Sequence, residues 1–120
     1  MARSLLVKVT CGTEDPERCN QALTVASAGV AAGAEVSLWL TGEAVWIGVP
    51  ARPVDLGLEH ATPVADLFEV VRTGGSVTVC TQCAARRGLT EADVADGVRI
   101  AGAAVFAEEA LREGAQALVY

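Results

Sequence analysis

The amino-acid sequence predicts an α/β fold, a three-layer sandwich with a mostly parallel sheet of four to five strands and helices on both faces. Short runs rich in valine and leucine alternate along the chain with longer segments whose apolar residues recur at helical spacing. The 120 residues contain no internal repeat, linker or low-complexity segment. We therefore expect a single domain over residues 1–120.

Composition and charge exclude several classes of function. Hydrophobic residues make up 52% of the chain and aromatic residues only 4%, so the core is aliphatic and its elements must pack closely or be covered by another subunit. The net charge of -6 argues against a nucleic-acid partner. No apolar run approaches the ~20 residues that span a bilayer, so we expect no membrane partner. The first residues lack a signal-peptide pattern, which predicts a cytoplasmic protein.

The first third of the chain predicts a strand, a helix and a second strand. Ser4 to Thr10 is a short run of leucine and β-branched residues and reads as a strand. Asp15 is a good N-cap and Pro16 is favoured in the first helical turn, so a helix begins there and ends near Gly33. Glu35 to Leu40 is the next strand.

The middle of the chain predicts a loop between two apolar segments. Ala44 to Val49 is either a short strand or a helical turn, and the two prolines that follow enforce a loop through Leu58. Trp46 either anchors this loop on the core or lines a pocket or a subunit contact. His60, the only histidine, stands beside the next helix start, which favours a surface position over a catalytic one.

The second half predicts a helix, a strand, a long helix and a closing strand. Apolar residues at helical spacing form one face between Thr62 and the Gly74-Gly75 stop, and Ser76 to Cys80 reads as the third strand. The T-x-x-D sequence at Thr90 resembles a capping box, so we expect a long helix from there to about Arg112. Ala115 to Tyr120 is the last strand.

Two cysteines at C-x-x-C spacing directly follow the third strand. Because ligands of open α/β sheets bind outside the carboxyl ends of the strands, Cys80 and Cys83 should lie at this edge, together with Cys11 after the first strand. Residues 81–87 favour a helix, whose N-terminus would lower a thiol pKa below the free value of ~8.5. Arg86 and Arg87 would add a smaller effect.

Such a pair of cysteines has four uses. It can carry sulfur as a persulfide, cycle between dithiol and disulfide, bind zinc with Cys11 and Cys19 as further ligands, or pack inertly in the core. The spacing of Cys11 and Cys19 does not match a zinc knuckle. The pair also lacks the flanking Trp and the intervening Gly-Pro of thioredoxin-type sites. The persulfide, redox and inert alternatives remain open on these grounds.

The stretches VTVCTQCAARRGL and EVSLWLTGEAVWIGV, with the opening strand and its Pro-started helix, resemble the DsrE family of small sulfur-relay and sulfur-oxidation proteins. The resemblance implies a YchN-like parallel α/β sandwich and a homo-oligomer, commonly a trimer or hexamer. It places the sulfur-accepting cysteine of active members on Cys80. Cys83 matches a second cysteine that some members have.

We therefore expect a cytoplasmic, thiol-dependent sulfur carrier of sulfurtransferase type that holds sulfane sulfur as a persulfide on Cys80, with Cys83 as its partner thiol. Cys11, Trp46 and Arg86 are candidate walls of the site. We expect no cofactor and no metal, and a sulfur donor or acceptor protein or a small thiol as partner. The alternatives are a non-catalytic oligomeric module that binds a ligand or partner, and a CxxC dithiol redox protein.

Overall fold

The computed structural model describes residues 3–120 and contains five strands and four α-helices in that range. Met1 and Ala2, which belong to the predicted domain, lie outside the described residues. In chain order the elements are β1 (Ser4–Val9), α1 (Pro16–Ala31), β2 (Glu35–Leu40), the 3-10 helix η1 (Gly42–Gly48), α2 (Val64–Gly74), β3 (Ser76–Cys80), α3 (Thr81–Arg86), β4 (Arg99–Ala101), α4 (Ala103–Ala110) and β5 (Ala115–Val119).

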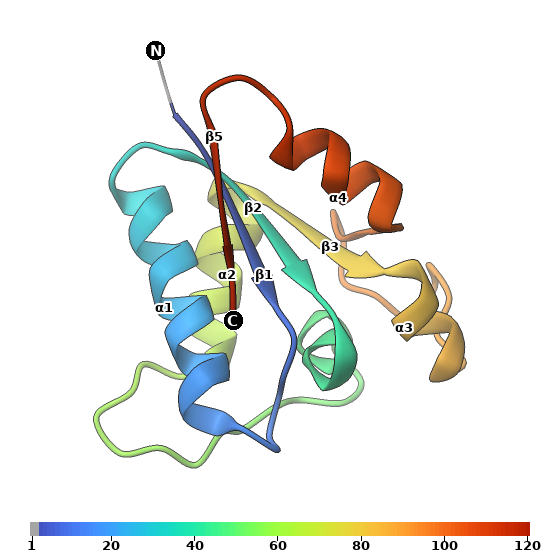
Figure 1. The fold of residues 1–120 in the computed structure, drawn as a ribbon. Helices are drawn as coiled ribbons and strands as arrows, with labels where there is room; N and C mark the ends of the chain where they lie inside the picture. Colours follow the sequence, from blue (N-terminus) through green and yellow to red (C-terminus); the bar gives the residue numbers. More distant parts are fainter. Residues whose placement is uncertain (1–2) are drawn as a thin grey trace.

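The five strands form one parallel sheet in the order β4-β3-β2-β1-β5. Helices α1 and α2 cover one face, α4 lies over the other, and α3 continues from the carboxyl end of β3 (Figure 1). This arrangement confirms the predicted α/β class, with helices on both faces of the sheet. The three central strands carry the aliphatic core, because their side chains are covered on both faces.

The local sequence explains where helix α1 lies and where it ends. The buried face of α1 comprises Cys19, Ala22, Leu23 and Ala26, which recur at the i, i+3, i+4, i+7 spacing of an amphipathic helix. The helix ends two residues before Gly33, whose φ of +87° suits glycine. Asp15 occupies the N-cap position but makes no side-chain capping bond, because its carboxylate pairs with Arg18 at 3.3 Å.

The long helix predicted from Thr90 to about Arg112 is wrong. Asp93 accepts hydrogen bonds from the backbone N–H and the hydroxyl of Thr90, at 2.8 and 3.1 Å, but these bonds close a turn. Gly97 then takes a φ of +84°, which interrupts any helix. The chain continues as β4, which pairs with β3, and only the short α4 remains helical.

The segment from Ala44 to Val49, for which the sequence allowed a short strand or a helical turn, is helical up to Gly48. Its apolar patch forms the 3-10 helix η1, which starts at Gly42, and α2 starts after Pro63 at Val64. His60 is exposed, in the loop before α2, with a φ of 57°. Within residues 3–120, no helix combines the length and the apolar character that a membrane span requires.

Candidate functional site

Cys80 is the last residue of β3, and α3 begins at the next residue. Its side chain is half-buried and opens onto a cavity of about 360 Å³ at the carboxyl edge of the sheet, on the face that α4 covers. This position is the usual ligand-binding edge of parallel sheets. The residues around this cavity, called the Cys80 cavity below, are Lys8, Thr10, Trp39, Thr41, Gly42, Cys80, Gln82, Cys83, Ala103 and Phe106.

Several hydrogen bonds favour the thiolate form of Cys80. Burial alone raises the pKa of this thiol, but donors around the sulfur outweigh burial. These donors are the backbone N–H groups of Cys83 and Gln82 and the side chain of Cys83, and the positive charge of Lys8 adds to them. The pKa of Cys80 is therefore lowered from its ordinary value, and the thiolate, which is the reactive form, is more populated near neutral pH.

Cys83 is buried in α3, and two contacts fix its position. The backbone N–H of Gly42 donates a hydrogen bond to the Cys83 sulfur at 3.2 Å. The guanidinium of Arg87 donates to the Cys83 carbonyl at 3.1 Å and to the Glu43 carboxylate at 2.8 Å. Arg87 thus ties α3, the helix that carries Cys83, to η1.

Three side chains from separate elements line the Cys80 cavity together with Cys80. Lys8 and Trp39 are register partners on β1 and β2, so they project from the same face of the sheet. The Phe106 ring packs edge-on against Trp39, with 5.3 Å between ring centroids. The Lys8 ammonium lies 5.1 Å from the centroid of the Phe106 ring, a cation–π distance.

Comparison with known proteins decides the family. The sequence matches the profile of the DsrE/DsrF-like family over residues 3–120. The chain belongs to the DsrE/DsrF-like family. A search of curated proteins gives no match.

Solved structures agree with this DsrE/DsrF-like assignment at the level of the fold. The crystal structure of the ychN protein from E. coli superimposes with a TM-score of 0.79 at 20% identity, covering 100% of both chains. MTH1491 from Methanobacterium thermoautotrophicum, a protein of unknown function, gives a TM-score of 0.69 at 12% identity, also covering 100% of both chains. At these identities the likeness shows a shared fold.

The structure separates the four cysteines of this DsrE/DsrF-like chain into two pairs. Cys11 and Cys19 are buried in the core cluster that includes α1, and neither lines the Cys80 cavity. Burial raises the pKa of Cys11 and raises that of Cys19 to about 12, so both stay protonated thiols at neutral pH. Among residues 3–120, no three Cys, His, Asp or Glu side chains are grouped to hold a metal ion.

The other two candidate wall residues also lie outside the Cys80 cavity. Trp46, in η1, lines a separate apolar cavity of about 350 Å³ between η1, the following loop and α2. The Arg52 guanidinium stacks 3.8 Å above its ring, and the Trp46 indole N–H donates to Glu43 at 3.3 Å. Arg86 is exposed at the end of α3, and the neighbouring Arg87 makes the contacts described above. A direct role of Trp46 or Arg86 in the site stays a prediction.

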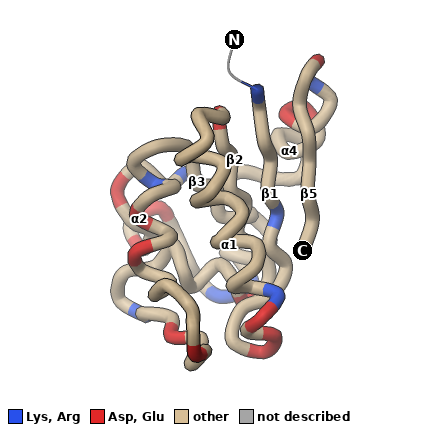
Figure 2. Tube along the Cα trace, turned by 90° about the vertical axis from the view of Figure 1, so that its left-hand side faces the viewer, with Lys and Arg blue, Asp and Glu red and all other residues tan. Residues whose placement is uncertain are grey.

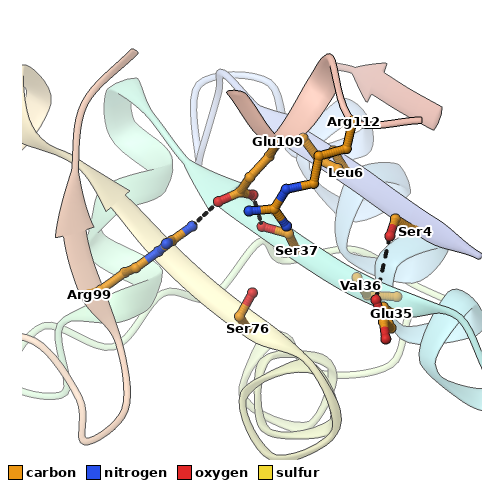
Figure 3. A pocket seen from close by; sticks show the side chains of 9 residues that line it. All are labelled: Ser4, Leu6, Glu35, Val36, Ser37, Ser76, Arg99, Glu109 and Arg112. Carbon is orange, nitrogen blue, oxygen red and sulfur yellow. Dashed lines mark hydrogen bonds and ion pairs between the residues drawn. The ribbon is translucent and has the colours of Figure 1, made fainter. Parts of the chain in front are cut away.

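A second cavity, of about 300 Å³, lies on the α4 side of the sheet and is lined by residues from the amino ends of β1, β2 and β3 (Figure 3). Glu109 of α4 is 7% exposed and accepts hydrogen bonds from Ser37 at 2.6 Å and from the Trp39 indole at 3.2 Å. Arg99 of β4 pairs with the same carboxylate and donates to Thr78 at 2.5 Å. These bonds hold α4 on the sheet, so they also fix the helix that carries the wall of the Cys80 cavity.

Sequence reasoning missed the site residues Lys8 and Phe106, and it considered Arg87 only as a weak positive charge near the two thiols. Lys8 is the only lysine, within a strand whose neighbours alternate between the two faces, and that alternation places it on the same side as Trp39. Arg87 follows Cys83 by four residues, the spacing of neighbours on one helix face. No sequence signal placed Phe106 at the site, because the sequence predicted one long helix where the structure has β4, a turn and α4.

Proposed function

We propose that the protein carries sulfane sulfur as a persulfide on Cys80. The observation that supports this function best is the setting of the Cys80 sulfur, which faces an open cavity and has a lowered pKa because backbone amides and the Cys83 side chain donate to it. Membership of the DsrE/DsrF-like family agrees with a role in sulfur relay. The three other thiols are buried.

The proposed chemistry is an exchange between sulfur atoms. The Cys80 thiolate attacks the outer sulfur of a donor persulfide, R–S–SH. A new S–S bond forms to Cys80, the S–S bond of the donor breaks, and the donor leaves as the thiolate R–S⁻. The product, Cys80–S–SH, passes its outer sulfur to an acceptor thiol in the same way, with no net oxidation. The amides that stabilise the thiolate can stabilise the persulfide anion after the transfer.

The test is intact-mass spectrometry after incubation with a low-molecular-weight persulfide donor. We expect an increase by the mass of one sulfur atom that dithiothreitol removes. Cys80→Ser should abolish the adduct, whereas Cys83→Ser should retain it. An adduct that survives Cys80→Ser, or no adduct on the wild-type protein, would refute the proposal.

The position of the two thiols supports a second function, a dithiol redox role. Cys80 and Cys83 line the same cavity, and the Cys83 side chain is one of the groups that lower the pKa of Cys80. In this case oxidised glutathione should produce an intramolecular disulfide between Cys80 and Cys83. A pair that remains reduced in a large excess of oxidised glutathione would exclude it.

We further propose that the protein is a homo-oligomer, a trimer or hexamer. Leu111, after α4, is 85% exposed and Val119, on the edge strand β5, is 63% exposed, which leaves apolar surface for a second copy to cover. The edge strand itself has no charged residue. Light scattering after size exclusion tests the mass, and a monomer at micromolar concentration would contradict this proposal. A cytoplasmic location and a thiol or protein partner for sulfur transfer remain predictions.

A further inference from the structure

The Cys80 cavity differs in charge from the rest of the molecule. The chain carries a net charge of -6, and its acidic positions are spread over several elements and loops (Figure 2). The residues that line the Cys80 cavity, all within the described range, include one lysine and no aspartate or glutamate. A cavity with only a positive charge in an acidic protein is a feature that a negatively charged ligand would use.

Lys8 is the source of this charge, and no carboxylate neutralises it within residues 3–120. None of the ion pairs in that range includes Lys8. Its side chain is half-buried and its ammonium rests near the Phe106 ring, which leaves the N–H donors without an acceptor from a carboxylate. A partly buried ammonium interacts more strongly with an anion than one in bulk water does.

Of the other polar side chains that line the cavity, only one has a hydrogen-bond donor free for a negatively charged ligand. The hydroxyls of Thr10 and Thr41 donate hydrogen bonds to main-chain oxygens of Tyr120 and Val9, at 2.6 and 2.9 Å, so neither hydroxyl has a proton left to donate to a ligand. The exposed amide of Gln82 has no hydrogen bond within the described residues and remains a free donor beside Cys80. Lys8 and Gln82 are thus the groups that a ligand could engage.

We infer that Lys8 selects sulfur donors and acceptors that carry a negative charge, such as a carboxylate, close to the reacting sulfur. This inference rests on the proposed function for its biological meaning, because it names the class of small thiol or persulfide that reaches Cys80. Lys8 acts here as a specificity residue. It binds the anionic group of the ligand while Cys80 makes and breaks the bonds to sulfur.

The experiment compares two alkylating reagents that have nearly the same shape and differ in charge. Iodoacetate is an anion and iodoacetamide is neutral, and both alkylate the Cys80 thiolate with loss of iodide. The ratio of their rate constants at one pH cancels any change in the pKa of Cys80, since both reagents need the same thiolate. Peptide mass spectrometry confirms the modified residue, and Cys80→Ser gives the background rate.

We expect Lys8→Gln to lower the iodoacetate-to-iodoacetamide ratio about three- to tenfold, the effect of removing one charge a few ångströms away in a partly solvated site. Lys8→Arg should preserve the ratio. Arg112→Gln, which changes the net charge equally at the other end of the sheet, is the matched control and should also preserve it. Addition of ~1 M salt should reduce the wild-type ratio toward that of Lys8→Gln, because the Debye length falls to ~3 Å.

A ratio that Lys8→Gln leaves unchanged, or that Arg112→Gln lowers as much, overturns the inference. A uniform loss of both rates with an unchanged ratio also overturns it, because Lys8 would then act on folding or on the thiol alone. This result is independent of sulfur transfer. A missing sulfur adduct on Cys80 would refute the carrier function but not the preference for anions. An adduct together with an unchanged alkylation ratio in Lys8→Gln would refute the preference for anions but not the carrier function.

Discussion

Glu109 offers the sharpest test of how α4 is held on the sheet. Its carboxylate is almost fully buried and accepts hydrogen bonds from Ser37 and Trp39 in addition to its pairing with Arg99. Breaking a buried ion pair costs about 3–5 kcal/mol when the remaining charge stays buried. The Arg99 side chain is 45% exposed, so water can resolvate its charge, and we expect Glu109→Ala to lower the free energy of unfolding by about 2 kcal/mol.

Two variants separate the contributions to this value. Glu109→Gln keeps an oxygen that accepts from Ser37 and Trp39, but it replaces the oxygen that pairs with Arg99 by an NH2 group, so we expect a loss of about 1 kcal/mol. Glu108→Ala removes the neighbouring, exposed glutamate of the same helix and should change stability by less than about 0.5 kcal/mol. The measurement is urea unfolding followed by circular dichroism. A loss for Glu109→Ala no larger than that for Glu108→Ala would show that these bonds do not hold α4.

The lowered pKa of Glu109 predicts that the stability of the fold depends on pH. Burial raises the pKa of Glu109, but the hydrogen bonds from Ser37, Arg99 and Trp39 outweigh it, so the folded-state pKa lies below the ordinary value. A carboxyl group of this kind stabilises the fold above its unfolded pKa of ~4.3, and the contribution disappears as the pH falls through the lower folded value. The stability gap between wild type and Glu109→Gln should therefore close in acid. A gap that is constant from pH 7 to pH 3 would contradict the lowered pKa.

Three further predictions concern the thiols and the turn beside them. Cys83→Ala removes a donor to the Cys80 thiolate and should slow its alkylation by iodoacetamide at neutral pH about 2- to 10-fold, with a smaller effect for Cys83→Ser; equal rates would remove Cys83 from this role. Gly42→Ala should destabilise the fold by about 2 kcal/mol in urea unfolding, because φ is +56° and a Cβ would lie 2.9 Å from a backbone oxygen. Gly57→Ala, with a φ of +65° and open space, is its control and should cost about 1 kcal/mol, so similar losses would exclude the steric cause. Cys19 should react with iodoacetamide only after unfolding, since burial raises its pKa to about 12, and a folded protein that is modified there would contradict its buried position.

The central part of the fold could be predicted because its signals are local. β2 and β3 are short runs of leucine, valine and other strand formers, and they have the predicted limits Glu35–Leu40 and Ser76–Cys80. The apolar residues of α1 keep one helical face over the whole element. Patterns of this kind report the burial of a segment, and burial decides the structure in the core of a parallel sheet.

The β4–α4 region could not be predicted because its structure depends on partners elsewhere in the chain. β4 has only three residues, too few for a periodic pattern, and its pairing with β3 makes it a strand. The alanine-rich sequence that follows has a high helix propensity, so local reasoning extends the helix in both directions. The Arg99–Glu109 pair, which joins β4 to α4, has no sequence signature that would stop this extension.

The same distinction between local and non-local signals applies to the candidate site. Cys80 and Cys83 could be assigned to the sheet edge, because a cysteine motif after a strand in a parallel fold has a defined location. Another part of the cavity lining combines Lys8 from β1 with Phe106 from α4, two residues that meet because α4 packs on the sheet through Trp39 and the bonds of Glu109. Cys80 and its donors lie within β3 and α3, so substitutions in α4 should change which ligands enter the cavity more than they change the thiol itself.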